Sequence, residues 1–360
     1  MKSILKRILP GFVISCLRKG RTECDLYLLR LATVSRLTAS LYYILNRSFV
    51  NEKYAVVKGR RAYQKSLRDI GSSCALLRRN IHRIEKGLIM RPRRPIFAES
   101  FIRETVECFK SAVLSDNLSS AEAKWAIDVL DEYFTVVATS SEIDRARAIY
   151  VRVREESNIA DESFSITDQY KPYPYRNLPE VNIEFDELKR LFIKRRSVRW
   201  YKDDHVPLTL VQKAANAASF APSACNRQAY RFIFCNERSK AVAIANCAGG
   251  TTGFAENLPA IIAVVGDLSA YPFERDRHLI YIDGSLAAMQ LMLALESLGL
   301  SSCAINWPEV DSSERKIRRL ISLNEYERVV MLLALGYADE DGGIPYSQKK
   351  MGNLILDDIS

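Results

Sequence analysis

The stretch from Asp283 to Trp307 reads DGSLAAMQLMLALESLGLSSCAINW and decides the architecture of the chain. Over Ile282–Leu298 it is apolar nearly all round, which is typical of a helix buried on most of its surface. Gly299 ends the predicted helix, and Ser302–Trp307 (SCAINW) has the short apolar pattern of a strand. The sequence therefore predicts a central helix that leads directly into a sheet.

The segments around this stretch alternate between strands and helices. Short apolar runs, partly β-branched, predict buried strands, and amphipathic stretches between them predict helices. The predicted strands are Tyr230–Cys235, Ala260–Val265 and Val329–Leu335, and the predicted helices are Phe185–Lys194, Leu208–Phe220 and the basic Ser312–Leu320. This order is typical of an α+β domain.

The first half of the chain has a different pattern. From Asp25 to about Tyr150 apolar residues recur at spacings of three and four, which predicts helices throughout, including one over Ala121–Val137. The Pro- and Tyr-rich stretch Gln169–Asn182 is expected to be extended, because each proline restricts the residue before it. We therefore predict a basic helical region over residues 1–168, a linker over residues 169–182 and a second domain over residues 183–360.

Composition limits the classes of function. A chain of 360 residues with 48% hydrophobic and 26% charged residues is ordinary for a globular protein of about two domains. Its eight cysteines include no CxxC pair, and there are only three histidines. A metal site or a disulfide framework is therefore not predicted, and reduced cytosolic thiols are expected.

Positive charge is concentrated near the N-terminus. Residues 1–110 hold 24 Lys and Arg against 8 Asp and Glu, a net +16, whereas the other 250 residues hold 28 against 35, a net −7. Such a basic region can bind a membrane surface or another polyanion. Nucleic acid is not expected, because the aromatic residues there fall at helical core spacing and form no stacking platform.

No transmembrane helix is predicted, because charges interrupt Ile4–Leu17 and Leu26–Leu45. A signal peptide is disfavoured by Pro10 and Gly11 and by the lack of an A-x-A-like cleavage site. Two interpretations of the first residues stay open, a basic amphipathic segment over Ile4–Leu9 on a membrane surface and a terminus or helix packed on the protein. We expect a cytoplasmic protein, with peripheral contact at the inner face of the membrane as an accompanying hypothesis.

Two polar segments carry the candidate chemistry. KRRSVRWY places Arg195, Ser197 and Arg199 close together, and paired guanidinium donors beside a hydroxyl suit a phosphate, although basic runs are usually solvated surface. APSACNRQAYRF, from Ala221 to Phe232, is a turn of small and amide residues that leads into a strand.

These two segments, in this order and at about this separation, resemble the RRSxR-like and PSxxNxQPW-like segments of the nitroreductase superfamily of FMN-dependent oxidoreductases. ENLPAIIAVVGDL from Glu256, the helix and strand of Asp283–Trp307, and GYADEDGGIPYSQKK also resemble the family. The chain departs from the pattern at Ala229 and Tyr230, where the family often has Pro and Trp. The resemblance covers about residues 185–350 and leaves residues 1–180 outside.

The resemblance implies a mainly antiparallel sheet flanked by helices, in an intertwined homodimer with two shared FMN sites. Residues implied to hold the phosphate, ribityl chain and pyrimidine edge from one subunit are Arg195, Arg196, Ser197 and Arg199. Those implied to come mostly from the other subunit are Pro222, Ser223, Ala224, Asn226 and Gln228. Ile305 and Asn306 are implied to approach the ring, and Lys349 and Lys350 to return to the phosphate or ribityl end.

The function that the resemblance implies is transfer of a hydride from NADH or NADPH to FMN and then to an electron-poor small-molecule acceptor, in a ping-pong cycle. A flavin brings its own chemistry, which agrees with the lack of a catalytic triad. The alternative is a dimeric binding or scaffold protein whose basic helices dock on a membrane or polyanion. Because both the arginine and the amide segment are present, the enzyme is favoured. We also expect a chain that begins near residue 170 to keep FMN.

Several single residues stay open between structural and functional roles. In Ile81–Leu88 (IHRIEKGL), His82 and Glu85 lie one helical turn apart among basic residues, as a structural pair or part of an anion site. His205 is expected at the surface and Cys225 in packing. Tyr230 and Trp307 are expected in the core, with stacking on flavin or substrate as the alternative.

Overall fold

The computed structural model describes residues 25–45, 49–115, 117–156, 169–350, 352, 355–356 and 358. The chain divides into two compact units, Met1–Tyr54 and Ala55–Ser360. In the first unit residues 25–32 are helical and α3 spans Arg36–Leu45, and α4 (Val50–Ser66) crosses the boundary. The predicted membrane-surface segment Ile4–Leu9 lies outside the described residues.

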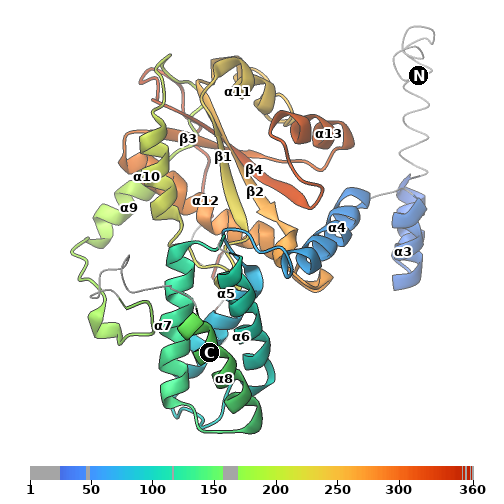
Figure 1. The fold of residues 1–360 in the computed structure, drawn as a ribbon. Coiled ribbons are helices and arrows are strands. Elements are labelled where there is room, and N and C mark those ends of the chain that lie inside the picture. The colour runs from blue at the N-terminus through green and yellow to red at the C-terminus, as the bar shows by residue number, and fades with distance from the viewer. Residues whose placement is uncertain are drawn as a thin grey trace. The chain divides into compact units, whose positions relative to one another are not determined.

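The second unit contains a four-stranded antiparallel sheet with the strand order β1-β2-β4-β3 (Figure 1). The strands are β1 (Tyr230–Cys235), β2 (Ala260–Asp267), β3 (Ser301–Asn306) and β4 (Glu327–Gly336). β2 and β4 are central, so they are buried on both faces, and β1 and β3 form the edges. The predicted α+β fold with a mainly antiparallel sheet is confirmed.

Helices cover both faces of this sheet (Figure 1). They are α9 (Phe185–Lys194), α10 (Leu208–Ala218), α11 (Arg238–Ala245), α12 (Leu279–Ser297) and α13 (Asp311–Leu320). Successive side chains of a strand point to opposite faces. Ile262 and Val264 accordingly pack with α10 and α12, while Ile261 and Ala263 pack with α11 and α13. This double burial explains why β2 is apolar at every position from Ala260 to Val265 instead of alternating.

Four helices upstream form a bundle with a core of its own. They are α5 (Ala75–Leu88), α6 (Glu99–Leu114), α7 (Ser120–Val136) and α8 (Ser141–Glu156). On α5 the spacing of Ile81, Ile84 and Leu88 directs these side chains into that core. At Gly87 a Cβ would lie 2.3 Å from the Phe97 ring, so only glycine permits this close approach. The predicted helical region is confirmed in the described part of the chain.

The helical region packs directly on the sheet region within the second unit. Ala55 and Val56 of α4 share a buried cluster with Leu268, Tyr271 and Ile280. The segment predicted as a linker contains η2 (Tyr175–Asn177) between extended residues. The division into residues 1–168, 169–182 and 183–360 stays a prediction.

The stretch Glu274–Ser297 is long and apolar enough, by length and composition alone, to cross a membrane. It contains α12, and the helix packs on the sheet through residues such as Ala288, Leu291 and Leu295. Core helices of globular folds have the same composition. This stretch is therefore no sign of a membrane span.

Candidate active site

The arginine segment lies beside the start of β3. Ser197 pairs with Ser302 in a parallel bridge, and the Val198 N–H donates to the Ser302 carbonyl at 3.1 Å. The Arg195 Nε and the Ser302 Oγ are both buried and have no hydrogen-bond partner among the described residues. Buried polar groups normally find partners, so each of these atoms is a position at which a polar ligand group would satisfy a missing hydrogen bond.

The other residues of this segment are held by the chain itself. The Arg199 guanidinium lies 5.7 Å from the centre of the Phe254 ring and donates to the Ser197 carbonyl at 3.2 Å. Arg196 Nη2 donates to the Tyr346 carbonyl at 2.8 Å. This bond ties the C-terminal tail to the arginine segment. The exposed Lys349 and Lys350 follow three and four residues after Tyr346, which brings the tail toward this group of residues.

The amide segment Pro222–Gln228 has an unusual backbone. Cys225, Asn226 and Gln228 have φ angles of 53°, 51° and 51°, in the left-handed region that residues other than glycine seldom adopt. Inside the segment, the Gln228 N–H donates to Ser223 Oγ at 3.2 Å and Gln228 Nε2 donates to Asn226 Oδ1 at 3.1 Å. Such conformations cost about 1–3 kcal/mol each and persist where surrounding contacts fix them.

Asp283 of α12 supplies one of the fixing contacts. Its Oδ2 accepts the Ala224 N–H at 3.0 Å and faces the Tyr271 hydroxyl at 3.4 Å. Burial raises the pKa of the Asp283 carboxyl above its ordinary value, and the Ala224 N–H opposes that rise. Nearby, the buried Tyr230 hydroxyl has no hydrogen-bond partner among the described residues, and burial together with Asp283 raises its pKa.

Arg78 of α5 supplies a second contact, from outside the sheet region. Its Nε donates to the Asn226 carbonyl at 2.9 Å, and its Nη1 lies 2.9 Å from Glu122 Oε2. Glu122 is buried and also accepts the Cys74 N–H at 2.9 Å and the Ser73 hydroxyl at 2.7 Å. The helical region therefore holds the amide segment from one side and α12 holds it from the other.

The two segments lie at opposite ends of α12. The amide segment contacts Asp283 near the start of the helix. Near the end of the helix, burial raises the pKa of the Glu296 carboxyl, and the positive charge of the nearby Arg195 opposes that rise. Thirteen residues of helix at about 1.5 Å each separate these positions by about 20 Å. One chain alone does not bring the two segments together.

The two residues at the end of β3 that are implied to approach the ring differ in their surroundings. The Ile305 side chain is buried in the core beneath α11 and α13, so only its backbone groups are left to face a ligand. The Asn306 side chain points to the opposite face and is exposed. Because β3 is an edge strand, half of its backbone polar groups point away from β4.

The structure also shows the surroundings of two residues whose roles the sequence left open, His205 and Trp307. His205 is exposed, as expected. The Trp307 indole packs against the core and donates to Glu314 Oε1 at 2.7 Å, which supports a core role. Within the described ranges, no three His, Cys, Asp or Glu side chains form a group that could hold a metal ion.

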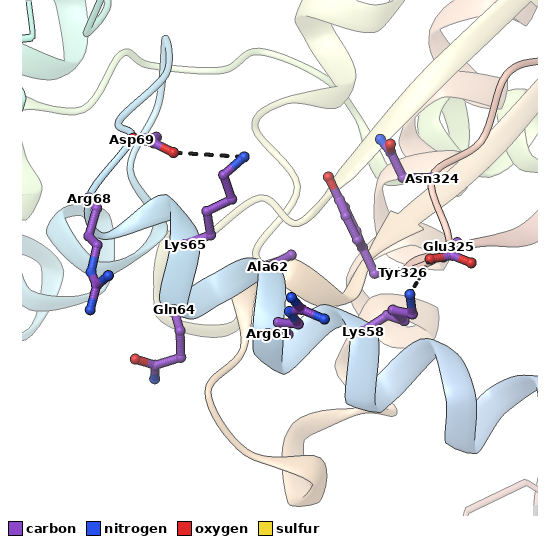
Figure 2. A pocket seen from close by; sticks show the side chains of 10 residues that line it. All are labelled: Lys58, Arg61, Ala62, Gln64, Lys65, Arg68, Asp69, Asn324, Glu325 and Tyr326. Carbon is purple, nitrogen blue, oxygen red and sulfur yellow. Dashed lines mark ion pairs between the residues drawn. The ribbon is translucent and has the colours of Figure 1, made fainter.

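A pocket of about 680 Å³ lies between α4 and the turn Asn324–Tyr326 (Figure 2). The residues that line it are Lys58, Arg61, Ala62, Gln64, Lys65, Arg68, Asp69, Asn324, Glu325 and Tyr326. Lys58 pairs with Glu325 at 2.6 Å, and Lys65 lies 3.8 Å from Asp69. No ion pair is recorded in the described part of the chain for the exposed side chains of Arg61 and Arg68. The α4 face of the pocket is therefore basic.

Asp283, Arg78 and Glu122 were not among the predicted site residues. The sequence could have pointed to Asp283, because it is a lone carboxylate at the start of an apolar helix. Arg78 stands in a run of basic residues, and nothing in that run distinguishes it from its neighbours. Its partner Asn226 lies 148 positions away, so only the packed structure reveals the contact.

Comparisons with known proteins agree with this fold. The family model described as "Nitroreductase family" matches residues 193–251 and 237–337, from the arginine segment to the end of β4. A protein of Methanothermobacter thermautotrophicus, whose name proposes NADH dehydrogenase or NAD(P)H nitroreductase activity, is 30% identical over 149 residues, which cover 41% of this chain and 76% of the relative. NADH dehydrogenase of Thermus thermophilus is 27% identical over 194 residues, which cover 45% of this chain and 92% of the relative.

Two further similarities were found. Iodotyrosine deiodinase 1 of Mus musculus is 21% identical over 232 residues, which cover 56% of this chain and 79% of the relative. The solved structure of an FMN-dependent nitroreductase from Clostridium difficile R20291 has 27% identity and a TM-score of 0.38. The match covers 46% of this chain and 93% of that one. The family model matches the region of the sheet and its helices, and the relative with 30% identity is covered over 76% of its length, so this chain belongs to the nitroreductase family of oxidoreductases.

Proposed function

We propose that this oxidoreductase binds FMN, takes a hydride from NADH or NADPH, and passes it to an electron-poor small-molecule acceptor in a ping-pong cycle. Family membership and the relatives named for NADH dehydrogenase activity support a flavin enzyme with a nicotinamide reductant. When bound, FMN supplies the hydride chemistry, and the chain binds and orients it. The acceptor class stays wide, because relatives named as deiodinases also match.

The residues present fit a flavin phosphate and ring. Arg195 Nε and Ser302 Oγ are buried and lack hydrogen-bond partners in the described structure, as expected of groups that bind an anionic ligand. Lys349 and Lys350 add positive charge near this end. In the amide segment, Asn226 and Gln228 offer the amide donors and acceptors that a pyrimidine edge requires. The proposed site therefore combines the arginine segment, the tail and the amide segment.

The observation that carries the proposal is the placement of these segments at opposite ends of α12. A second copy, related by a two-fold axis with its α12 antiparallel to the first, would bring each arginine segment to the partner's amide segment. α12 also exposes an apolar stripe, Ile282, Leu286 and Met289, at 47%, 43% and 37% of their surface. Exposed apolar stripes on a core helix are typical of an interface. We therefore propose a homodimer with two shared sites.

We further propose a cytoplasmic protein with peripheral contact at an anionic membrane surface. The basic N-terminal region supports this proposal, as do Arg61 and Arg68, which add exposed positive charge on one face of α4. Basic side chains close to anionic lipid contribute about 1 kcal/mol each.

The deciding experiment is the colour of the purified protein. We expect a yellow protein that NADH or NADPH bleaches in the absence of oxygen. Arg195→Ala with Arg199→Ala should lose FMN, since a hydrogen bond to a charged group contributes about 1.5–3 kcal/mol. A protein that stays colourless after addition of FMN, or a folded double variant with full flavin content, would contradict the proposal.

A further inference from the structure

The sequence IHRIEKGL places an imidazole beside a carboxylate on α5. His82 Nδ1 lies 3.4 Å from Glu85 Oε2, and the Trp125 indole donates to the other oxygen, Glu85 Oε1, at 3.0 Å. Trp125 comes from α7, so the Glu85 carboxylate is fixed between two helices. Glu85 lies on the Nδ1 side of the ring, so proton exchange with a ligand falls to the other nitrogen, Nε2. The His82 side chain is 32% exposed.

The amide segment runs alongside α5 in the opposite direction. Ala75 packs against the cluster that contains Ala229. Arg78 binds the Asn226 carbonyl. Residue numbers therefore rise along α5 where they fall along the amide segment, so the two run antiparallel.

His82 lies on the same helix face. Ala75, Arg78 and His82 follow at spacings of three and four, which places them in one row along α5. His82 stands one turn beyond Arg78, on the side of α5 from which Arg78 contacts the amide segment. Meanwhile Ile81 and Ile84 fill the bundle core on another face of the helix. The pair of His82 and Glu85 is therefore turned toward the site and away from the core.

We propose that His82 is the proton donor to the acceptor, an inference that rests on the proposed function. Reduction of a quinone to a hydroquinone takes up one hydride and one proton. The hydride comes from the nicotinamide reductant by way of the flavin. The proton comes from His82, whose Nε2–H bond breaks as an O–H bond of the product forms. The imidazole is left neutral and takes a new proton from solvent before the next turnover.

A purely structural role predicts a different outcome. A partly exposed His and Glu one turn apart contribute little to stability, at most about 1 kcal/mol. Glu85 also accepts from Trp125, so a change at Glu85 would disturb the contact between α5 and α7 as well as the proton donor. The test is therefore made at His82, with His205→Gln, an exposed histidine in a turn, as the matched control.

The test separates two acceptors of the reduced holoenzyme in stopped-flow measurements. Menadione needs a proton together with its electrons, whereas ferricyanide takes electrons singly and needs no proton. In His82→Gln we expect flavin reoxidation by menadione to slow by about 100-fold, the usual lower range for general acid catalysis. Flavin content, reduction by NADH and reoxidation by ferricyanide should stay at the values of the unaltered protein. His205→Gln should change none of these rates.

A second readout does not depend on turnover. The chain has three histidines, so the imidazole NMR signals of the oxidised holoprotein can be assigned with His82→Gln and His205→Gln. Menadione added without reductant should shift the His82 signal and leave that of His205 in place.

The outcomes are distinct. Menadione reoxidation at an unchanged rate in a yellow, NADH-reducible His82→Gln overturns the proton donor and leaves the proposed function standing. Equal slowing with both acceptors assigns His82 a structural role and also overturns the inference. A protein that neither binds nor reduces FMN removes the proposed function itself.

Discussion

Arg78 on α5 holds the carbonyl of Asn226 at 2.9 Å from its Nε, and the same guanidinium lies 2.9 Å from the buried Glu122. The helical region, which the family resemblance does not cover, thus fixes a segment expected to contact the flavin. Because Asn226 lies between two other left-handed residues, Cys225 and Gln228, the segment depends on outside contacts for its shape.

Arg78→Met is therefore expected to weaken both fold and flavin binding. It leaves the buried Glu122 without its cation, which costs about 3 kcal/mol, and frees the Asn226 carbonyl. Urea unfolding and FMN titration measure the two effects. Arg68→Met is the control, because Arg68 is exposed and has no recorded ion pair in the described structure. A yellow Arg78→Met protein with unchanged stability would show that the contact does not hold the segment.

The sequence predicted the fold better than the site. Local pattern identified helix Phe185–Lys194 and strand Tyr230–Cys235 with the bounds that the structure has, because amphipathic and apolar periods are local properties. The face of the sheet to which a side chain points, by contrast, can be known only from the folded sheet. Ile305 was implied to approach the ring, yet the pleat turns its side chain into the core. The contact of Arg78 with Asn226 depends on tertiary packing that no local pattern encodes.

Truncation tests whether the helical region belongs to the site. The sequence alone suggested that a chain beginning near residue 170 keeps FMN. The packing of Ala55 and Val56 on Leu268 and Tyr271, together with the Arg78 contact, leads us to expect the opposite. Removal of residues 1–169 exposes that buried cluster, so the remainder should bind FMN weakly or aggregate. A chain beginning at Phe49, just before α4, should keep its flavin. Equal flavin content of the two chains would contradict this expectation.

Asp283 should make stability depend on pH. Burial raises the pKa of this carboxyl above its ordinary 3.8. Between the unfolded and folded pKa values the native state binds more protons than the unfolded chain, so the free energy of unfolding falls as pH rises through this range. Asp283→Asn cannot ionise, and its amide oxygen can still accept the Ala224 N–H. We therefore expect a smaller fall in the variant.

Urea unfolding from about pH 4 to pH 7 measures this dependence. Asp267 and Glu296, whose pKa values burial also raises, leave a residual slope in both proteins. Asp204→Asn, at an exposed carboxyl, is the control and should keep the slope of the unaltered protein. Identical slopes for Asp283→Asn and the unaltered protein would contradict the assignment.

Membrane contact is expected to depend on salt. The full chain should sediment with phosphatidylserine vesicles at low ionic strength and be released as salt screens the charges. Replacement of both Arg61 and Arg68 by Glu should weaken this binding, because it reverses the charge of two exposed side chains on the basic side of the pocket. Phosphatidylcholine vesicles are the control. Equal sedimentation with phosphatidylserine and phosphatidylcholine vesicles, or no sedimentation at low salt, would rule out this kind of contact.

A mixed dimer tests whether each flavin site is shared. If Arg195 of one chain and Asn226 of the other form one site, a dimer with Arg195→Ala on one chain and Asn226→Ala on its partner carries both lesions in a single site. The other site stays intact. Each lost hydrogen bond to a charged group is worth about 1.5–3 kcal/mol, or about 10- to 100-fold in FMN affinity.

We therefore expect the mixed dimer, purified through two different tags, to bind one FMN with unaltered affinity and to have lost the second. Sites confined to single chains predict another result, since each would then carry one lesion and neither would keep full affinity. A dimer with both substitutions on one chain is the matched control. In a shared arrangement its lesions fall in different sites, because Arg195 and Asn226 lie near opposite ends of α12, and both sites weaken. Flavin titrations that fail to distinguish the two dimers would exclude the shared site.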